Sequence, residues 1–236
     1  MSEWTTRRFW TEASVEPVGS GHAVRLDGRA VRTPLKTELV VPSAALAHGV
    51  AEEWRAQEKM VDPRTMPLTR AVNATLDKVV PQRAEVAANL VEYGVTDLLC
   101  YRAPVDGTLF ERQDREWQPM LDWAEERFGA RLAVTRGVIP VPQPPEAVLP
   151  LRARVESMSE WELTALSEFV SLSGSLVLGL AAMEDHPPEA IWTLSRIDED
   201  WQAEQWGVDE EEAERIALKR AAFLQAHRYL GLVRAG

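Results

Sequence analysis

Residues 22–33 read HAVRLDGRAVRT, and this stretch decides the fold expected for the N-terminal part of the chain. Two short runs of β-forming residues flank Asp27-Gly28, a dipeptide that favours a two-residue type I′ hairpin because both positions tolerate positive φ. Further β-like segments lie on either side, between residues 8 and 41. An isolated hairpin is only marginally stable, so the pattern predicts a small sheet or barrel.

The pattern becomes helical after Ser43. This residue has the character of an N-cap, and Leu46, Val50 and Trp54 follow it on one helical face. Beyond Pro150 the chain is helical in pattern almost throughout. Strands followed by helices predict an α+β fold. Residues 1–60 are expected to form a small β-rich N-terminal domain of strands, hairpin and first helix. Residues 61–236 are expected to form a larger all-α multihelical C-terminal domain.

The negative charge of the chain is local. The formal net charge is −11, yet Glu184–Glu214 holds twelve carboxylates against the single base Arg196. The rest of the chain has 25 acids and 25 bases. No basic face is visible for phosphates, so nucleic acid is not an expected partner. A protein with a basic surface is the better electrostatic match.

Three features of the sequence predict the cellular compartment: its cysteine content, its first ten residues and its longest apolar run. Its one cysteine, Cys100, cannot form an internal disulfide. The first ten residues lack the apolar region of a secretory signal. The longest apolar run, Phe169–Met183, is shorter than the roughly 20 residues of a membrane span. We therefore expect a buried core helix in a cytoplasmic protein, without membrane insertion.

No catalytic constellation is recognisable. The chain has neither a glycine-rich phosphate loop nor a nucleophile elbow. The four histidines are scattered without metal-ligand spacing, and Cys100 lies in an apolar stretch that predicts an inert thiol. We expect no enzymatic activity, no cofactor and no metal.

The acidic stretch raises two questions when residues 187–206 are interpreted as one helix. Asp198 then lies on the flank of an apolar stripe that contains Leu194 and Trp201, about 40° from Leu194. Its carboxylate then needs a partner or water, and an internal salt bridge or a helix-cap contact is the alternative to a contact with a partner protein. Trp192 and Trp206 lie off the stripe, so they are either exposed for binding or covered by neighbouring helices. An acidic run by itself is usually a solvated face.

Short motifs spread along the chain resemble a known family, the alpha-subunit-specific assembly chaperones of the F-type ATP synthase catalytic head. This is the family of mitochondrial ATP synthase assembly factor 2, and this chain resembles a bacterial member. The resemblance is carried by Leu26-Asp27-Gly28-Arg29, Glu53-Trp54 with Gln57, Met66-Pro67-Leu68-Thr69, Leu99-Cys100-Tyr101-Arg102, Arg127-Phe128-Gly129, Glu199-Asp200-Trp201-Gln202 and Trp206-Gly207.

The resemblance implies a non-enzymatic chaperone. It would bind the free alpha subunit and shield the surface that later contacts the beta subunit, without nucleotide or metal. A cytoplasmic bacterial monomer is expected, with eukaryotic relatives in the mitochondrial matrix. The family depends on an acidic residue in its C-terminal helical region, here Asp198 or Glu199. The client-binding candidates are Asp198, Glu199, Trp201, Trp206, Trp192 and Trp54.

Two other functions stay open on the sequence. One is an enzyme whose catalytic carboxylates are scattered along the chain. The other is an acidic docking module for a different basic protein.

Overall fold

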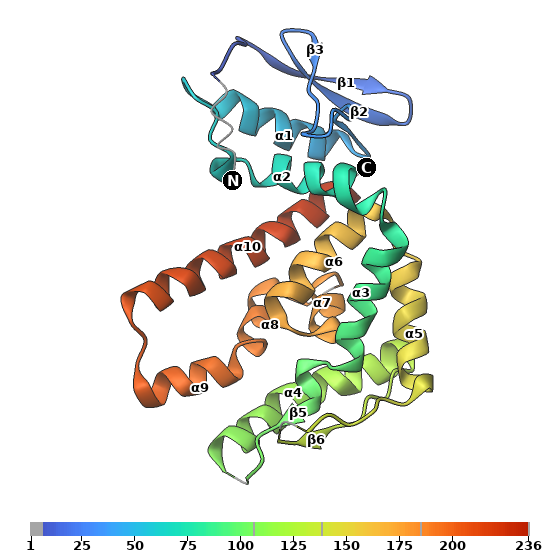
Figure 1. Ribbon diagram of the computed structural model, residues 1–236, viewed down its shortest axis with the longest axis vertical. Coiled ribbons are helices and arrows are strands. Elements are labelled where there is room, and N and C mark those ends of the chain that lie inside the picture. Colours follow the sequence, from blue (N-terminus) through green and yellow to red (C-terminus); the bar gives the residue numbers. More distant parts are fainter. Residues whose placement is uncertain (1–6, 106, 138, 185, 236) are drawn as a thin grey trace. The chain divides into compact units, whose positions relative to one another are not determined.

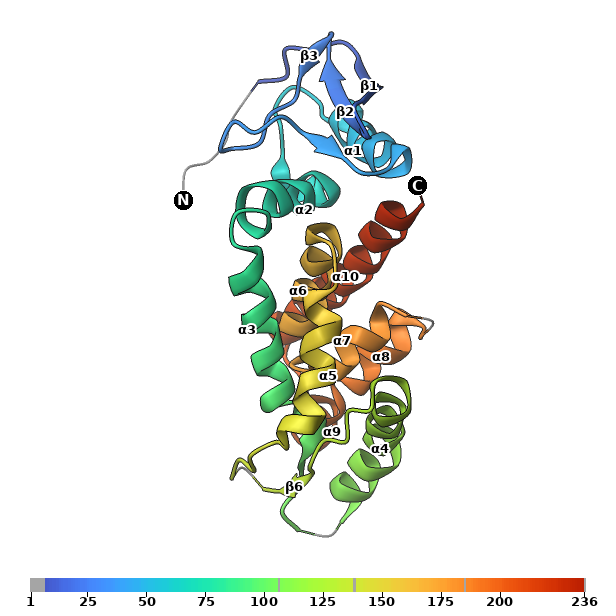
Figure 2. The same cartoon turned by 90° about the vertical axis from the view of Figure 1, so that its right-hand side faces the viewer.

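The computed structural model describes residues 7–105, 107–137, 139–184 and 186–235, and the chain divides into two compact units. Unit 1 comprises Met1–Arg83, Glu160–Thr164 and Arg228–Gly236. Unit 2 comprises Ala84–Ser159 and Ala165–His227. The elements of both units are labelled in Figures 1 and 2.

Unit 1 begins with an antiparallel sheet (Figure 1). Its central strand β2 (Gly21–Leu26) pairs with β1 (Ala13–Val18), β3 (Arg29–Ala30) and β4 (Val40–Val41). Asp27 and Gly28 connect β2 to β3 with φ angles of 48° and 77°, as a type I′ turn requires. The predicted hairpin is therefore confirmed.

Helix α1 (Ala44–Ala56) packs against this sheet and buries Leu46 and Val50. Ser43 is its N-cap, because the Ser43 hydroxyl accepts a hydrogen bond from the Leu46 N–H at 3.1 Å. The chain continues through η1 (Pro63–Thr65), α2 (Pro67–Ala74) and η2 (Thr75–Val79).

Unit 1 extends beyond residue 60, where the sequence pattern placed the domain boundary. The Glu53 carboxylate of α1 accepts hydrogen bonds from the Leu68 and Thr69 N–H groups at 2.7 and 2.8 Å, which fixes the start of α2. Later in the chain, Tyr229 returns to this unit, and its hydroxyl lies 3.0 Å from that of Thr75. Unit 1 is therefore built from three separate stretches of sequence, and one boundary in the sequence does not separate it from unit 2.

Unit 2 is helical apart from β5 (Tyr101–Arg102) and β6 (Thr135–Arg136), which pair in parallel. The short helix α7 (Leu176–Ala182) lies at its centre, and all seven of its residues are buried. The predicted α+β class, with a β-rich beginning and a multihelical remainder, is confirmed. The other helices that contribute to unit 2 are α3 (Arg83–Val95), η3 (Leu98–Cys100), α4 (Thr108–Phe128), α5 (Pro145–Glu156), α6 (Glu160–Ser173), α8 (Pro188–Leu194), α9 (Ile197–Trp206) and α10 (Glu210–Arg234).

Two helices that the sequence pattern predicts as continuous are broken. Gly174 has a φ of 72° between α6 and α7, and Ser175 caps α7 by accepting from the Leu178 N–H at 3.0 Å. Between α8 and α9, the Ser195 hydroxyl donates to the Trp192 carbonyl at 2.7 Å and Arg196 leaves helical geometry. The single helix assumed for residues 187–206 was wrong.

A buried carboxylate joins two parts of unit 2. Asp97 is fully buried, and its two oxygens accept from the Leu99 N–H at 3.1 Å and the Val177 N–H at 3.0 Å. Burial raises the pKa of Asp97 to about 6. The same burial raises the pKa of the neighbouring Cys100 thiol to about 12, so this cysteine carries no thiolate near neutral pH.

Candidate functional site

The six candidate residues are divided between the two units. Trp54 belongs to unit 1, on α1, whereas Asp198, Glu199, Trp201 and Trp206 lie on α9 of unit 2. Trp192 lies on α8.

Helix α9 is organised by its charges. Its first turn contains Asp198, Glu199 and Asp200, which suit the positive end of the helix dipole. Arg196 forms an ion pair with Asp200 at 3.2 Å one turn away. Gly207, with a φ of 80°, ends the helix after Trp206.

Asp198 points toward α4 rather than freely into water. Its Oδ1 accepts a hydrogen bond from Gln113 Nε2 at 2.6 Å. The other end of this amide, Gln113 Oε1, accepts from the Ala103 N–H at 2.6 Å. Gln113 is buried and Asp198 is half-buried, so one amide fixes the carboxylate to both α4 and the segment after β5. The internal contact considered for Asp198 therefore exists, with a glutamine as partner.

A buried cation contributes to the electrostatics of this carboxylate. Burial raises the pKa of Asp198, while the Gln113 hydrogen bond and the attraction of Arg102 oppose that rise. Burial lowers the pKa of Arg102, whose guanidinium donates to the Leu99 carbonyl and lies 5.3 Å from the Trp117 ring centroid. Among the described residues, Arg102 Nε and Nη2 have no hydrogen-bond partner. Removing the Asp198 charge would leave this cation less compensated.

The outer face of α9 combines an exposed aromatic ring with carboxylates. Trp206 is 76% exposed and makes an edge contact with Trp201, with the ring centroids 6.1 Å apart. Trp201 is half-buried and donates from Nε1 to the Thr108 hydroxyl at 3.4 Å. Glu199, on the same helix, is also exposed. We call Asp198, Glu199, Trp201 and Trp206 the α9 surface. Exposed tryptophan is typical of protein-contact sites.

Trp192 lies outside the α9 surface, contrary to its selection as a client-binding candidate. It is only 5% exposed, and its ring packs 5.7 Å from that of Phe223 on α10. The Arg196 guanidinium covers it at 5.6 Å from the ring centroid. Of the two alternatives left open for tryptophans off the stripe, burial applies to Trp192 and exposure to Trp206.

Sequence reasoning missed both residues that act on Asp198, Gln113 through a hydrogen bond and Arg102 through its charge. Arg102 lies within one of the motifs that carry the family resemblance, but nothing local assigns it a role. Gln113 is one polar residue among many on α4, and its contact with Asp198 spans 85 residues of sequence.

The described part of the chain contains no group of three or more histidine, cysteine or acidic side chains placed to hold a metal ion. Within the same residues, no helix combines the length and apolarity needed to cross a membrane.

Comparison with known proteins identifies the family. The family model described as ATP12 chaperone protein matches residues 7–125. Atp12 from Paracoccus denitrificans is 46% identical, with a TM-score of 0.94 over 98% of this chain and 100% of that chain. A variant of that relative with lysine in place of one aspartate is 46% identical and also has a TM-score of 0.94, over 99% and 100%.

A curated relative agrees with this match. The mitochondrial protein atp12 of Schizosaccharomyces pombe is 25% identical over 214 residues, which span 85% of this chain and 74% of the relative. The resemblance inferred from the motifs is confirmed, and the chain belongs to the ATP12 chaperone family.

Proposed function

We propose that this chaperone acts in assembly of the F-type ATP synthase and binds the free alpha subunit of the catalytic head. It covers the surface of that subunit that later contacts beta, acts without catalysis, and works in the bacterial cytoplasm. The observation that carries the proposal is the α9 surface, where one helix presents both a fixed carboxylate, Asp198, and the exposed Trp206. The family resemblance supplies the identity of the client.

The α9 surface has the chemistry that such a client requires. A subunit interface that is exposed before assembly contains apolar area and is prone to aggregation. Trp206 and Trp201 offer apolar contact area with few rotatable bonds. Glu199 and Asp198 favour basic neighbours and steer association. Because beta would compete for the same client surface, its arrival provides a route to release.

The proposal is tested by capture with purified components. The chain, immobilised at micromolar concentration, is expected to retain the alpha subunit and not the beta subunit. Equal retention of both would favour a general acidic docking module. Clean separation of alpha from the chaperone would refute the proposed function.

Charge reversal on α9 is expected to weaken capture. Glu199→Lys, like Trp206→Ala, should raise the Kd for the alpha subunit about 5- to 30-fold, which corresponds to roughly 1–2 kcal/mol for a contact residue. Both side chains are exposed, so the melting temperature should stay near that of the wild type. Titration of labelled alpha subunit measures the change.

Glu126→Lys is the matched control for Glu199→Lys. Glu126 is an exposed glutamate on α4, and its replacement changes the net charge equally. If Glu126→Lys weakens capture as much as Glu199→Lys, the effect is overall charge and the α9 surface is not the contact.

A further inference from the structure

Unit 1 contains a groove that the α9 surface does not explain. Its volume is about 1180 Å³, and its lining comes from the loop after β3, from α1 and from the segment between Met60 and Lys78. Small-molecule pockets usually measure roughly 300–1,000 Å³. The groove is therefore large enough for a stretch of polypeptide. Trp54, the client-binding candidate that belongs to unit 1, is one of its lining residues.

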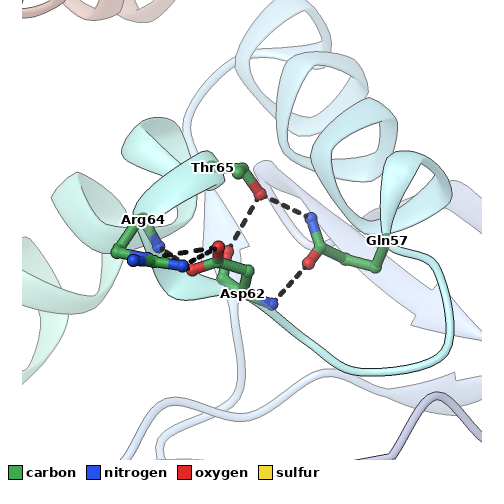
Figure 3. A network of polar contacts seen from close by, with 4 residues as sticks. All are labelled: Gln57, Asp62, Arg64 and Thr65. Atoms are coloured by element: carbon green, nitrogen blue, oxygen red, sulfur yellow. Dashed lines mark hydrogen bonds and ion pairs between the residues drawn. The ribbon is translucent and has the colours of Figure 1, made fainter.

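A polar network within residues 57–65 holds the side of the groove that Met60–Arg64 form (Figure 3). The Gln57 amide donates to the Thr65 hydroxyl at 3.1 Å and accepts from the Asp62 N–H at 2.7 Å. Asp62 binds the Arg64 guanidinium through two hydrogen bonds, at 2.9 Å to Nε and 2.8 Å to Nη2. Figure 3 shows Gln57, at the end of α1, pointing toward Asp62 and Thr65 across the loop that leads to η1.

The loop after β3 is fixed in a similar way. The Asp77 carboxylate accepts from the Thr33 hydroxyl at 2.6 Å and from the Leu35 N–H at 3.1 Å. Both sides of the groove are thus formed before any ligand binds. Such pre-organisation lowers the entropy that binding would otherwise cost.

The lining leaves apolar side chains open to water. Leu35 is 70% exposed and Met60 is 44% exposed. Methionine adapts its shape to different apolar partners. Exposed apolar residues that gather at one groove are typical of an interaction site, whereas scattered single ones are normal on any protein surface.

The charges at the groove indicate which side chains an occupant should carry. Arg32, Arg70 and Lys78 are exposed lining residues. Both carboxylates of the lining are already engaged, Asp62 by Arg64 and Asp77 by the loop after β3. The groove is therefore positive on a protein whose net charge is −11. Its complement is an apolar segment that carries acidic side chains.

We propose that this groove binds an extended, apolar segment of the client polypeptide flanked by acidic residues. The proposal rests on the proposed chaperone function, and it adds a second contact with the opposite charge preference to that of the α9 surface.

Photo-crosslinking tests the proposal in the full chain. A benzophenone amino acid is placed at Leu35 or at Met60, and the chaperone is irradiated with purified alpha subunit. Crosslinks from both positions are expected, and mass spectrometry should map them to one apolar segment with neighbouring acids. The control position is Arg29, which is exposed in the same unit and does not line the groove.

Charge reversal supplies an independent measurement. Arg70→Glu is expected to raise the Kd for the alpha subunit about 5- to 10-fold, while Arg29→Glu leaves it within twofold. Both arginines are exposed, so circular dichroism and melting should match the wild type in each variant.

The outcomes separate this proposal from the proposed function. If the wild type captures alpha but Leu35 and Met60 crosslink no better than Arg29, the groove proposal fails and the function stands. If the wild type captures no alpha subunit, the function fails and the groove proposal fails with it. Crosslinks to a second copy of this chain would show the groove to be a self-contact and would also overturn it.

Discussion

Asp97→Ala is expected to lower the free energy of unfolding by about 4 kcal/mol, since each buried N–H that loses its acceptor costs roughly 1–3 kcal/mol. The two N–H groups concerned belong to Leu99 and Val177, one before β5 and one in central helix α7. Urea denaturation followed by circular dichroism measures the loss. A change below about 1 kcal/mol would show that water or rearrangement replaces the carboxylate.

The same residue predicts a pH dependence of defined sign. The pKa of Asp97 is about 6 in the folded protein against an ordinary value of 3.8. Between these values the folded protein holds a proton that the unfolded chain has released. The contribution of Asp97 to stability therefore falls as the pH rises through this window, by at most about 3 kcal/mol.

Asp97→Asn isolates this contribution, because asparagine does not titrate in the window. The stability advantage of the wild type over the variant is expected to be largest near pH 4 and to shrink toward pH 7. An advantage that grows with pH would contradict the raised pKa.

Asp198→Lys is expected to reduce capture of the alpha subunit by about tenfold or more, a loss of at least roughly 1.4 kcal/mol. The substitution removes the acceptor of Gln113 and places a second cation near Arg102. Because Asp198 is half-buried, the lysine can extend into water, and unit 2 should remain folded with a modestly lower melting temperature. The Paracoccus relative keeps its similarity to this chain, with a TM-score of 0.94, with and without its own aspartate-to-lysine replacement.

Asp198→Asn is the control for this prediction, since it removes the charge and keeps an oxygen for Gln113. Capture close to that of the wild type in the asparagine variant, with loss in the lysine variant, would assign the effect to the added cation. Normal capture by a folded Asp198→Lys protein would exclude Asp198 from the client contact.

Sequence motifs correctly predicted those features of the fold that depend only on residues close together in the chain. Asp27-Gly28 predicted the hairpin because its turn geometry is set by two residues, and Ser43 predicted the start of α1 in the same way. Glycine commonly marks the end of a helix, yet Gly94 lies within α3. A side chain at Gly94 would come within 2.9 Å of Leu176, so this glycine serves close packing that a local pattern does not reveal.

The candidate site depended on contacts between distant residues, and prediction was weaker there. The acidic residues of α9 were found from composition, yet the partners of Asp198 come from β5 and α4. The break at Ser195 also puts Trp192 on a different helix from the α9 residues, so one helical wheel does not describe both. The groove of unit 1 has no sequence signature, since its lining spans residues 32–78.

The proposed groove, which Trp54 lines, and the α9 surface would be two client contacts on one chain, and this has a consequence for how firmly a client is held. Two contacts on one chain bind the same client at a high effective concentration, so each can be weak while their combination is strong. Losing either contact then lowers the overall affinity far more than its own strength suggests. An assembling subunit that displaces only one of them could release the client quickly, without having to compete for both.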